Sequence, residues 1–253
     1  MNPGYAQSYR DLYEKHWWWR TRESTLSEAL GRVLVGKPGS YKILDIGCGD
    51  RLSFGFLSKW GKVQGVEPDR SLLSDQSLTD PNLYVGPWDD RQPFQGPFDL
   101  VTALDVIEHI EKDQEAVKRM ADLLKPGGVL LIHVPASPSL WTRHDEINQH
   151  HRRYTPRELR GLIEVSGLEV LEMRGCFWFT VPIKWLQSKF ERNFPKCAHH
   201  PGVPKIPSLW INRVLMAWCR FENFLGRFLR FDFGSSLLLL ARRSPTRPQL
   251  DSQ

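Results

Sequence analysis

The sequence predicts an α/β fold in which helices cover both faces of a doubly wound, mostly parallel sheet. Short apolar runs alternate with amphipathic stretches between residues 41 and 136, which is the pattern of βαβ units. A glycine-rich turn directly follows the first apolar run, as it does where a buried strand passes into a helix. We expect strands at 41–46, 62–67, 82–86, 98–103 and 128–134, and helices at 51–60, 70–77 and 114–124.

The flanking regions follow other patterns. Thr155-Pro156-Arg157-Glu158 is a capping box with proline at the first helical position, so a helix begins there and ends at Gly167. Further strands are expected at 168–175 and 236–241, and residues 5–35 are expected to be helical. The chain then divides into an N-terminal helical cover (1–40), a core (41–175 and 234–243), a helical insertion between the last two strands (176–233) and a flexible tail (244–253).

Composition and charge narrow the class of protein. The 253 residues carry a formal charge of +5 with a pI near 9.1, which suits a membrane surface or an acidic substrate. No dense lysine and arginine run occurs, so nucleic acid is not an expected partner. The four cysteines form no Cys-x-x-Cys pair, so we expect buried thiols and no metal site. Without a signal-peptide core or an apolar run of ~20 residues, a cytoplasmic protein is expected.

A cofactor constellation begins with Asp45-x-Gly47-x-Gly49 at the end of a buried apolar strand. Glycines there allow a tight turn and close approach of a ligand, and the following helix N-terminus suits a carboxylate or phosphate. Asp45 can face an ammonium group. Glu67 ends the second strand, 22 positions after Asp45, where an acid hydrogen-bonds ribose hydroxyls.

Three later motifs continue the same register: Phe98-Asp99-Leu100-Val101, Leu104-Asp105-Val106-Ile107-Glu108-His109-Ile110, and Leu123-Leu124-Lys125-Pro126-Gly127-Gly128-Val129-Leu130. With them the chain resembles the class I S-adenosylmethionine-dependent methyltransferases, in particular the small-molecule group that includes the ubiquinone-biosynthesis O-methyltransferases. The resemblance covers residues 41–175, and residues 234–243 are similar to the family's final antiparallel strand. It implies a Rossmann-like fold with S-adenosylmethionine as cofactor.

The resemblance also implies a role for each matching residue. Asp45, Gly47, Cys48 and Gly49 would line the methionine end of the cofactor, beside Leu104 and Asp105. Glu67 would hold the ribose. Pro68 and Asp69 would lie near the adenine, with Asp89 reading its amino group and Trp88 as a ring partner. N-terminal helices in the family cover the cofactor, which implies a lid role for Trp19, Arg20 or Arg22.

Arg51 departs from the family, which usually has a third small residue at this position. Because Leu57, Gly61 and Glu67 keep the family register, Arg51 is a substitution and not a gap. Its guanidinium could pair with the cofactor carboxylate, project to solvent, or mark a site that no longer binds.

Methyl transfer to a hydroxyl needs a base, and histidine is a natural base at neutral pH. The loop after the fifth strand contains His144, His150 and His151, of which His144 and His151 are the preferred candidates, and His109 follows the fourth strand. A structural hydrogen bond is the alternative role for each. Arg152 and Arg153 could hold an acidic acceptor or simply support the loop.

The inserted segment carries an apolar stripe at helical spacing: Trp210, Val214, Trp218, Phe221, Leu225 and Phe228. Arg213, Arg220 and Arg227 flank it. Packing against the domain is favoured, and a peripheral membrane contact through 206–230 is the alternative.

The sequence therefore predicts an enzyme that methylates a small or lipid- or glycan-linked acceptor, with oxygen the expected target atom. An NAD(P)-dependent oxidoreductase is the enzyme alternative, but position 52 is leucine where its glycine pattern needs a third glycine. A non-catalytic, membrane-associated cofactor-binding scaffold is the other.

Overall fold

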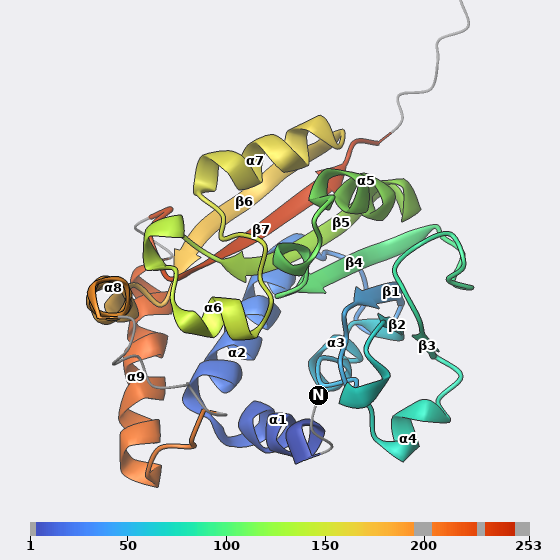
Figure 1. Cartoon of the computed structure of the whole chain (residues 1–253). Coiled ribbons are helices and arrows are strands. Elements are labelled where there is room, and N and C mark those ends of the chain that lie inside the picture. The colour runs from blue at the N-terminus through green and yellow to red at the C-terminus, as the bar shows by residue number, and fades with distance from the viewer. Residues whose placement is uncertain (1–3, 195–203, 227–230, 246–253) are drawn as a thin grey trace, which may run out of the picture.

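The sheet runs through the middle of the molecule, as Figure 1 shows. The computed structural model describes residues 4–194, 204–226 and 231–245. Its strands form one seven-stranded sheet in the order β3-β2-β1-β4-β5-β7-β6. Their bounds are β1 Tyr41–Ile46, β2 Gly61–Glu67, β3 Leu83–Val85, β4 Phe98–Leu104, β5 Leu124–Pro135, β6 Leu168–Cys176 and β7 Ser236–Arg243. Only β7 runs antiparallel to its neighbours β5 and β6 among these strands, which confirms the predicted fold.

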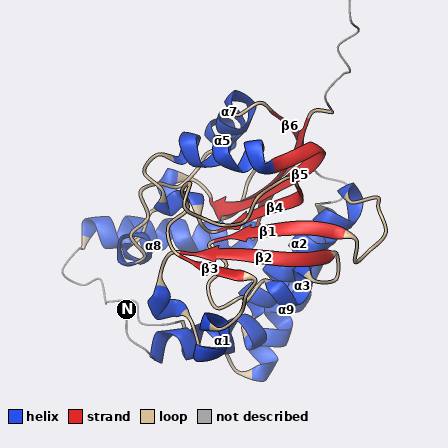
Figure 2. Ribbon diagram, turned by 90° about the vertical axis from the view of Figure 1, so that its right-hand side faces the viewer, coloured by secondary structure: helices blue, strands red, loops and turns tan. Residues whose placement is uncertain are grey.

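Both faces of the central strands are covered because their side chains alternate between two apolar cores. In β1, Leu44 and Ile46 face the core under α5 (Asp113–Leu123) and α7 (Pro156–Val165), whereas Ile43 faces the core under α2 (Trp17–Val33). Strands buried on both faces read as continuous apolar runs, which is why the pattern was visible in the sequence. Figure 2 shows the two helical layers from the side.

Two predicted helices are shorter than expected. Of residues 51–60 only α3 (Phe54–Leu57) is α-helical, because Arg51 adopts a left-handed φ of 58° and extends the glycine turn. Residues 70–77 form a short 3-10 helix, η1 (Arg70–Leu72), and then α4 (Asp75–Leu78). The side chains of Asp69 and Ser74 each cap a new turn there, and such caps compete with one continuous helix.

The chain passes from α5 into β5 earlier than predicted. The helix ends at Leu123 and the strand begins at Leu124, where it pairs with Phe98 before a register shift. The segment expected to be a turn is therefore the first part of an extended strand, although Gly127 still has a positive φ of 79°.

The N-terminal residues form α1 (Gly4–Lys15) and α2, and the insertion contributes α8 (Val181–Asn193) and α9 (Leu209–Leu225). Shorter elements complete the chain: η2 (Ile107–His109), η3 (Pro138–Leu140), α6 (Arg143–Ile147) and η4 (Trp178–Thr180). The α2 and α9 helices lie side by side over one face of the sheet (Figure 1). The tail predicted to be flexible lies, from residue 246 on, outside the described residues.

The α9 helix packs on the protein through its polar side, contrary to the expectation that its apolar stripe is buried. The Asn212 side chain accepts a hydrogen bond from Trp17 N at 2.7 Å and donates one to Lys15 O at 2.7 Å. Asn223 donates to Thr25 Oγ1 at 2.6 Å. These specific bonds orient the helix, so Trp210, Val214, Trp218 and Phe221 are exposed. Phe228 of the stripe and Arg227 beside it lie outside the described residues.

Candidate active site

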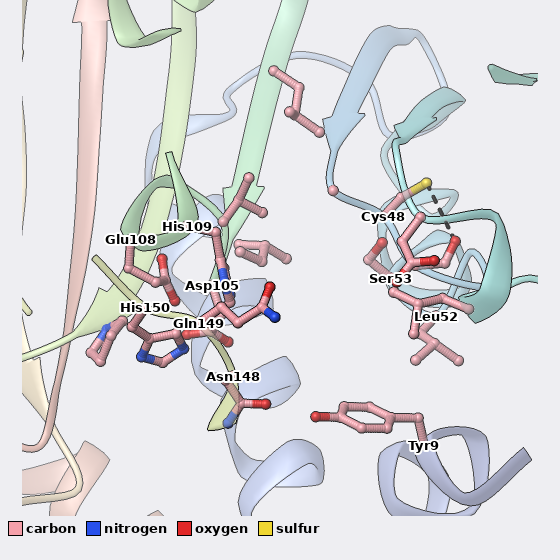
Figure 3. A pocket seen from close by; sticks show the side chains of 18 of the residues that line it. Tyr9, Cys48, Leu52, Ser53, Asp105, Glu108, His109, Asn148, Gln149 and His150 are labelled. Carbon is pink, nitrogen blue, oxygen red and sulfur yellow. Dashed lines mark hydrogen bonds between the residues drawn. The ribbon is translucent and has the colours of Figure 1, made fainter. Parts of the chain in front are cut away.

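A cavity of about 1250 Å³ opens at the carboxyl ends of β1 and β4. These neighbouring strands are the point where strand order reverses, which is where ligands bind in doubly wound sheets. The volume exceeds the usual ~300–1000 Å³ of a single small-molecule pocket, so it can hold a cofactor and an acceptor together. In Figure 3, Cys48, Leu52 and Ser53 lie on one side of the cavity, and Glu108, His109 and His150 lie on the other.

The glycine turn after β1 forms a cradle. Gly47 has a φ of 65°, and a Cβ there would lie 2.5 Å from the Val106 side chain. Gly49 has a φ of 54° and its missing Cβ faces open space. Both positions thus need glycine for backbone conformation, and Gly49 leaves room for a ligand. Cys48 between them is buried, with its thiol 3.7 Å from Gly49 O.

Two carboxylates border this cradle. Asp45 is buried and accepts hydrogen bonds from the hydroxyls of Ser53 and Thr102. Burial raises the pKa of Asp45 to about 6, partly offset by these two hydroxyls. Glu67 accepts from Gly49 N and Asp69 N, each at 2.8 Å, one bond to each oxygen. Each Glu67 oxygen keeps a lone pair, so the carboxylate is oriented and still able to bind two neighbouring hydroxyls.

Asp105, directly after β4, is held by two basic side chains. It pairs with Arg22 of α2 and with His133 Nδ1 at 2.8 Å, and its φ of 59° is left-handed. Burial alone would raise its pKa, but the charges of His133 and Arg22 hold the pKa of Asp105 well below its usual range. Arg22 also lies 5.2 Å from the Trp18 ring. The N-terminal cover is thereby tied to the sheet at the cavity, where a lid would have to lie.

Several other predicted residues also line the cavity: Pro68, Asp69, Trp88, Leu104 and Trp19. The Trp88 indole N–H is buried and has no partner within the described part of the chain. A buried donor of this kind normally has a partner, so a ligand acceptor atom at this end of the cavity fits it. Arg20 does not line the cavity and lies 3.8 Å from Glu23.

Arg51 and Asp89 do not line the cavity, although Arg51 was a candidate partner of the cofactor carboxylate and the resemblance implied that Asp89 reads the adenine. The Arg51 guanidinium pairs with Asp80, and its Nε donates to Ser77 Oγ at 3.0 Å. Asp89 caps Arg91 N at 2.9 Å and pairs with the Arg91 guanidinium. Both side chains are therefore engaged by local partners that the sequence pattern does not reveal.

The opposite wall brings Glu108, His109 and His150 together. One ligand atom from each lies within 4.8 Å of the others, and the two imidazole centroids are 4.6 Å apart. Both Glu108 oxygens are buried and without a hydrogen-bond partner in the described residues. Burial, and then the Asp105 charge, raises the pKa of Glu108 well above its usual range. Burial lowers the pKa of His109 to about 4, so His109 is neutral at physiological pH.

The predicted histidines have separate positions. His109 and His144 line the cavity, and His144 contacts Asn148 Nδ2 at 3.0 Å. His151 is exposed and does not line the cavity; its backbone N–H donates to Glu108 O at 2.8 Å. We expected His151 rather than His150 to be the base, and Glu108 was not among the candidates. Only the fold shows that the loop turns His150, and not its neighbour, toward η2.

Arg152 and Arg153, expected to hold an acidic acceptor or to support the loop, are both used structurally. Arg153 donates to both oxygens of Asp145, at 2.8 and 2.9 Å. His150 Nδ1 lies 2.9 Å from the same carboxylate. Arg152 pairs with Asp113 at 3.0 Å. The buried network of Asp145, Arg153 and His150 positions His150, and each arginine is already paired with a carboxylate.

Comparison with known proteins agrees with this geometry. A family model described as a methyltransferase domain matches residues 18–173. The ubiquinone biosynthesis O-methyltransferase of Idiomarina loihiensis is 28% identical over 165 residues, covering 54% of this chain and 65% of that protein. The chain thus spans a little under two thirds of that relative. The protein of the same name from Coxiella burnetii is 32% identical over 183 residues, covering 62% of this chain and 76% of that protein.

Solved structures share the fold. The complex of the Haloferax volcanii Trm112 methyltransferase activator with a methyltransferase matches with a TM-score of 0.60 at 18% identity, over 96% of each chain. Haemonchus contortus phosphoethanolamine N-methyltransferase 2, solved with S-adenosyl-L-methionine, matches with a TM-score of 0.54 at 18% identity, over 87% of this chain and 52% of that one. The chain therefore belongs to the methyltransferase-domain family, whose members with this fold use S-adenosylmethionine as methyl donor.

The raised pKa of Asp45 generates a pH-dependent prediction. The resemblance implies that Asp45 faces the cofactor's ammonium group, which only the ionised carboxylate attracts. Affinity for S-adenosylmethionine should then fall about tenfold per pH unit below the Asp45 pKa, which is about 6. Calorimetric titration between pH 5 and 8 measures this. Asp45→Asn should bind weakly at every pH, and a flat wild-type profile would contradict the role of Asp45.

A second prediction concerns Arg51. Because its guanidinium is committed to Asp80 outside the cavity, Arg51→Gly should leave the dissociation constant for S-adenosylmethionine within about threefold, which is under 1 kcal/mol. The variant loses an ion pair but relieves a left-handed backbone that glycine adopts freely. A tenfold loss of affinity in calorimetry would show that Arg51 binds the cofactor after all.

Proposed function

We propose that this protein transfers a methyl group from S-adenosylmethionine to an oxygen atom of a small or lipid- or glycan-linked acceptor. The observation that carries the proposal is the buried Glu108, without a hydrogen-bond partner among the described residues, beside His109 and His150 and facing the Asp45 and Glu67 side of one cavity. The cofactor supplies an electrophilic methyl on a sulfonium. The protein must then align the acceptor, exclude water and take up the hydroxyl proton.

The opposite wall suits that proton transfer. Once ionised, a Glu108 carboxylate with a raised pKa is a stronger base than an exposed one. The neutral His109 imidazole lies next to it and can hydrogen-bond the acceptor or Glu108. His150 is oriented by Asp145 through its Nδ1, which leaves Nε2 as the free ring nitrogen. The names of the O-methyltransferase relatives support oxygen as the target atom.

The same three side chains also form a ligand set of two imidazoles and one carboxylate that suits a divalent metal ion. A metal there would lower the pKa of a bound hydroxyl and replace the base. Activity measured with chelator and with added Zn²⁺, Fe²⁺ or Mn²⁺ separates the two roles.

The two remaining alternatives, a nicotinamide oxidoreductase and a non-catalytic scaffold, differ from a methyltransferase in the cofactor bound or in the absence of turnover. Calorimetry with S-adenosylmethionine and with NADH distinguishes a methyltransferase from a nicotinamide oxidoreductase. Transfer of a tritiated methyl group to hydroxylated aromatic acceptors and to a lipid extract distinguishes an enzyme from a scaffold. Binding of NADH alone would overturn the proposal.

Glu108→Gln should reduce methyl transfer by ~100-fold or more, because the variant has no base at this position. Affinity for S-adenosylmethionine should be unchanged, and Glu146→Gln, at an exposed acid of α6, should retain full activity. A loss of only a few-fold would remove Glu108 as the base.

The same variant tests the burial of Glu108 through thermal stability. A carboxyl group whose folded pKa is raised contributes stability at low pH that is lost as pH rises through that pKa. The melting temperature of Glu108→Gln relative to wild type should therefore increase from pH 5 to pH 8. A constant difference would contradict the raised pKa of Glu108.

We further propose that the protein contacts an anionic bilayer through the α8–α9 surface, defined as the exposed apolar side chains Ile183, Trp185, Leu186, Phe190, Trp210, Ile211, Val214, Trp218, Phe221 and Phe224. Among the described helices none is long and apolar enough to span a membrane.

The α8–α9 surface is flanked by exposed cations: Lys189, Arg192, Arg213 and Arg220. The acid of α9, Glu222, is buried and accepts from Trp178 N at 2.8 Å. Glu191 of α8 is half-buried and accepts from Arg143 N at 2.7 Å. Exposed aromatic and basic side chains therefore predominate on this surface, which suits a helix at a negatively charged lipid interface.

Vesicle flotation tests this contact. The protein should float with vesicles containing about 30% anionic lipid and less with neutral vesicles, since each basic residue near an anionic surface contributes about 1 kcal/mol. Trp210→Glu should release it, whereas Val165→Glu, at an exposed apolar residue of α7, should not. Failure of wild type to float would disprove the membrane contact without affecting the proposed reaction.

A further inference from the structure

Lys184 differs from the other described cations that line the cavity because it has no carboxylate partner among the described residues. The other described lysine and arginine side chains of the lining each have a carboxylate partner: Arg22 with Asp105, Lys112 with Glu115, Arg119 with Asp90, and Arg153 with Asp145. Lys184 is half-buried and has neither an ion pair nor a hydrogen bond with any described residue. A partly desolvated ammonium without a partner is costly to maintain.

The backbone around Lys184 adds to the positive potential. The residue lies in the first turns of α8, whose N-cap, Thr180, also lines the cavity. The N-terminal end of a helix favours anions. Glu222 holds the preceding segment through Trp178 N, and Thr180 Oγ1 bonds Phe177 O at 2.7 Å. The ammonium is thus presented to the cavity from a fixed helix end.

The charges facing Lys184 do not neutralise it. Asp145 and Arg153 lie on the packed loop, but the Asp145 carboxylate is already bonded to Arg153 and His150. Burial, and then the Arg153 charge, lowers the pKa of Lys184 to about 8. Burial also lowers the pKa of His144. The Asp145 charge partly opposes this effect, and the Lys184 charge adds to it. The charges of Asp145 and Asp105 act on the Lys184 pKa in the opposite direction to burial, but Asp145 is bonded to Arg153 and His150, and Asp105 to Arg22 and His133, so neither carboxylate pairs with Lys184.

We infer that Lys184 is an anion-binding subsite of the acceptor, which therefore carries a carboxylate or phosphate group in addition to its hydroxyl. The assignment of the occupant as acceptor rests on the proposed function; the affinity for an anion does not. The subsite comes from the helical insertion, so the segment between β6 and β7 selects acceptors while the sheet binds the cofactor. Lys184, and not Arg152 or Arg153, would bind the anionic group of the acceptor, because both arginines already pair with carboxylates.

Nuclear magnetic resonance of the full chain tests the subsite without any turnover. Lysines are converted to ¹³C-dimethyl-lysine, and the Lys184 resonance is assigned with Lys184→Arg. Benzoate, phenyl phosphate and neutral benzyl alcohol are titrated into the protein. An anion bound at the ammonium should raise the Lys184 pKa by about one unit, which corresponds to about a tenfold preference for the charged form. Exposed Lys189 on the same helix is the matched control and should not shift.

Each outcome decides between the cases. If only benzoate raises the Lys184 pKa, the acceptor carries a carboxylate; if only phenyl phosphate raises it, the acceptor carries a phosphate. A rise with both anions also supports the subsite. No shift with either anion up to about 50 mM, where even a millimolar site would fill, or an equal shift with benzyl alcohol, overturns it. Calorimetry with S-adenosylmethionine is run on the same sample. Binding of cofactor without anion overturns only the subsite, and binding of anion without cofactor overturns only the proposed function.

Discussion

The ion pair between Arg22 and Asp105 is the interaction on which the site depends. Asp105 is the first residue after β4, and its left-handed backbone directs the carboxylate toward α2 and His133. Arg22 is buried and Asp105 half-buried, so loss of Asp105 would leave a largely desolvated guanidinium without its carboxylate, which is destabilising. The pair fixes α2 across the cavity, and α9 in turn packs on α2 through Asn212 and Asn223. The Asp105 carboxylate thus connects the N-terminal helices to the sheet, and the insertion is connected to the sheet through α2.

The two halves of the cavity are built differently. On the cofactor half, the glycine turn and the amides of Gly49 and Asp69 orient the carboxylate of Glu67, so backbone conformation does most of the positioning. On the proposed acceptor half, the buried Glu108 carboxylate and the Lys184 ammonium have no partner among the residues that the structure describes. Unpaired buried polar groups cost stability, and they cluster where function needs them. This contrast separates cofactor binding, which the fold shares with its relatives, from acceptor binding.

The α9 helix reverses the usual arrangement of an amphipathic helix. Its polar side chains Asn212 and Glu222 are buried and bonded, whereas Trp210 and Phe221 are exposed. Directional hydrogen bonds to α2 and to the segment before α8 decide the orientation, because a hydrophobic stripe has no preferred partner of its own. The exposed aromatic side is then available at the same end of the molecule as α8, which contributes Lys184 to the cavity.

The sequence by itself determined the sheet, the glycine cradle and the two strand-end acids Asp45 and Glu67, because strand period, turn glycines and strand-end positions are local properties of the chain. It also placed His109 at the site. Helix lengths at 51–60 and 70–77 were wrong, since the left-handed Arg51 and the caps of Asp69 and Ser74 are conformational choices made in context. Only the tertiary structure decided that Arg51 pairs with Asp80, that His150 and not His151 faces Glu108, and that Lys184 has no ion-pair partner in the described part of the chain. Those outcomes depend on residues far apart in the chain competing for the same charges, and spacing along a sequence carries no record of that competition.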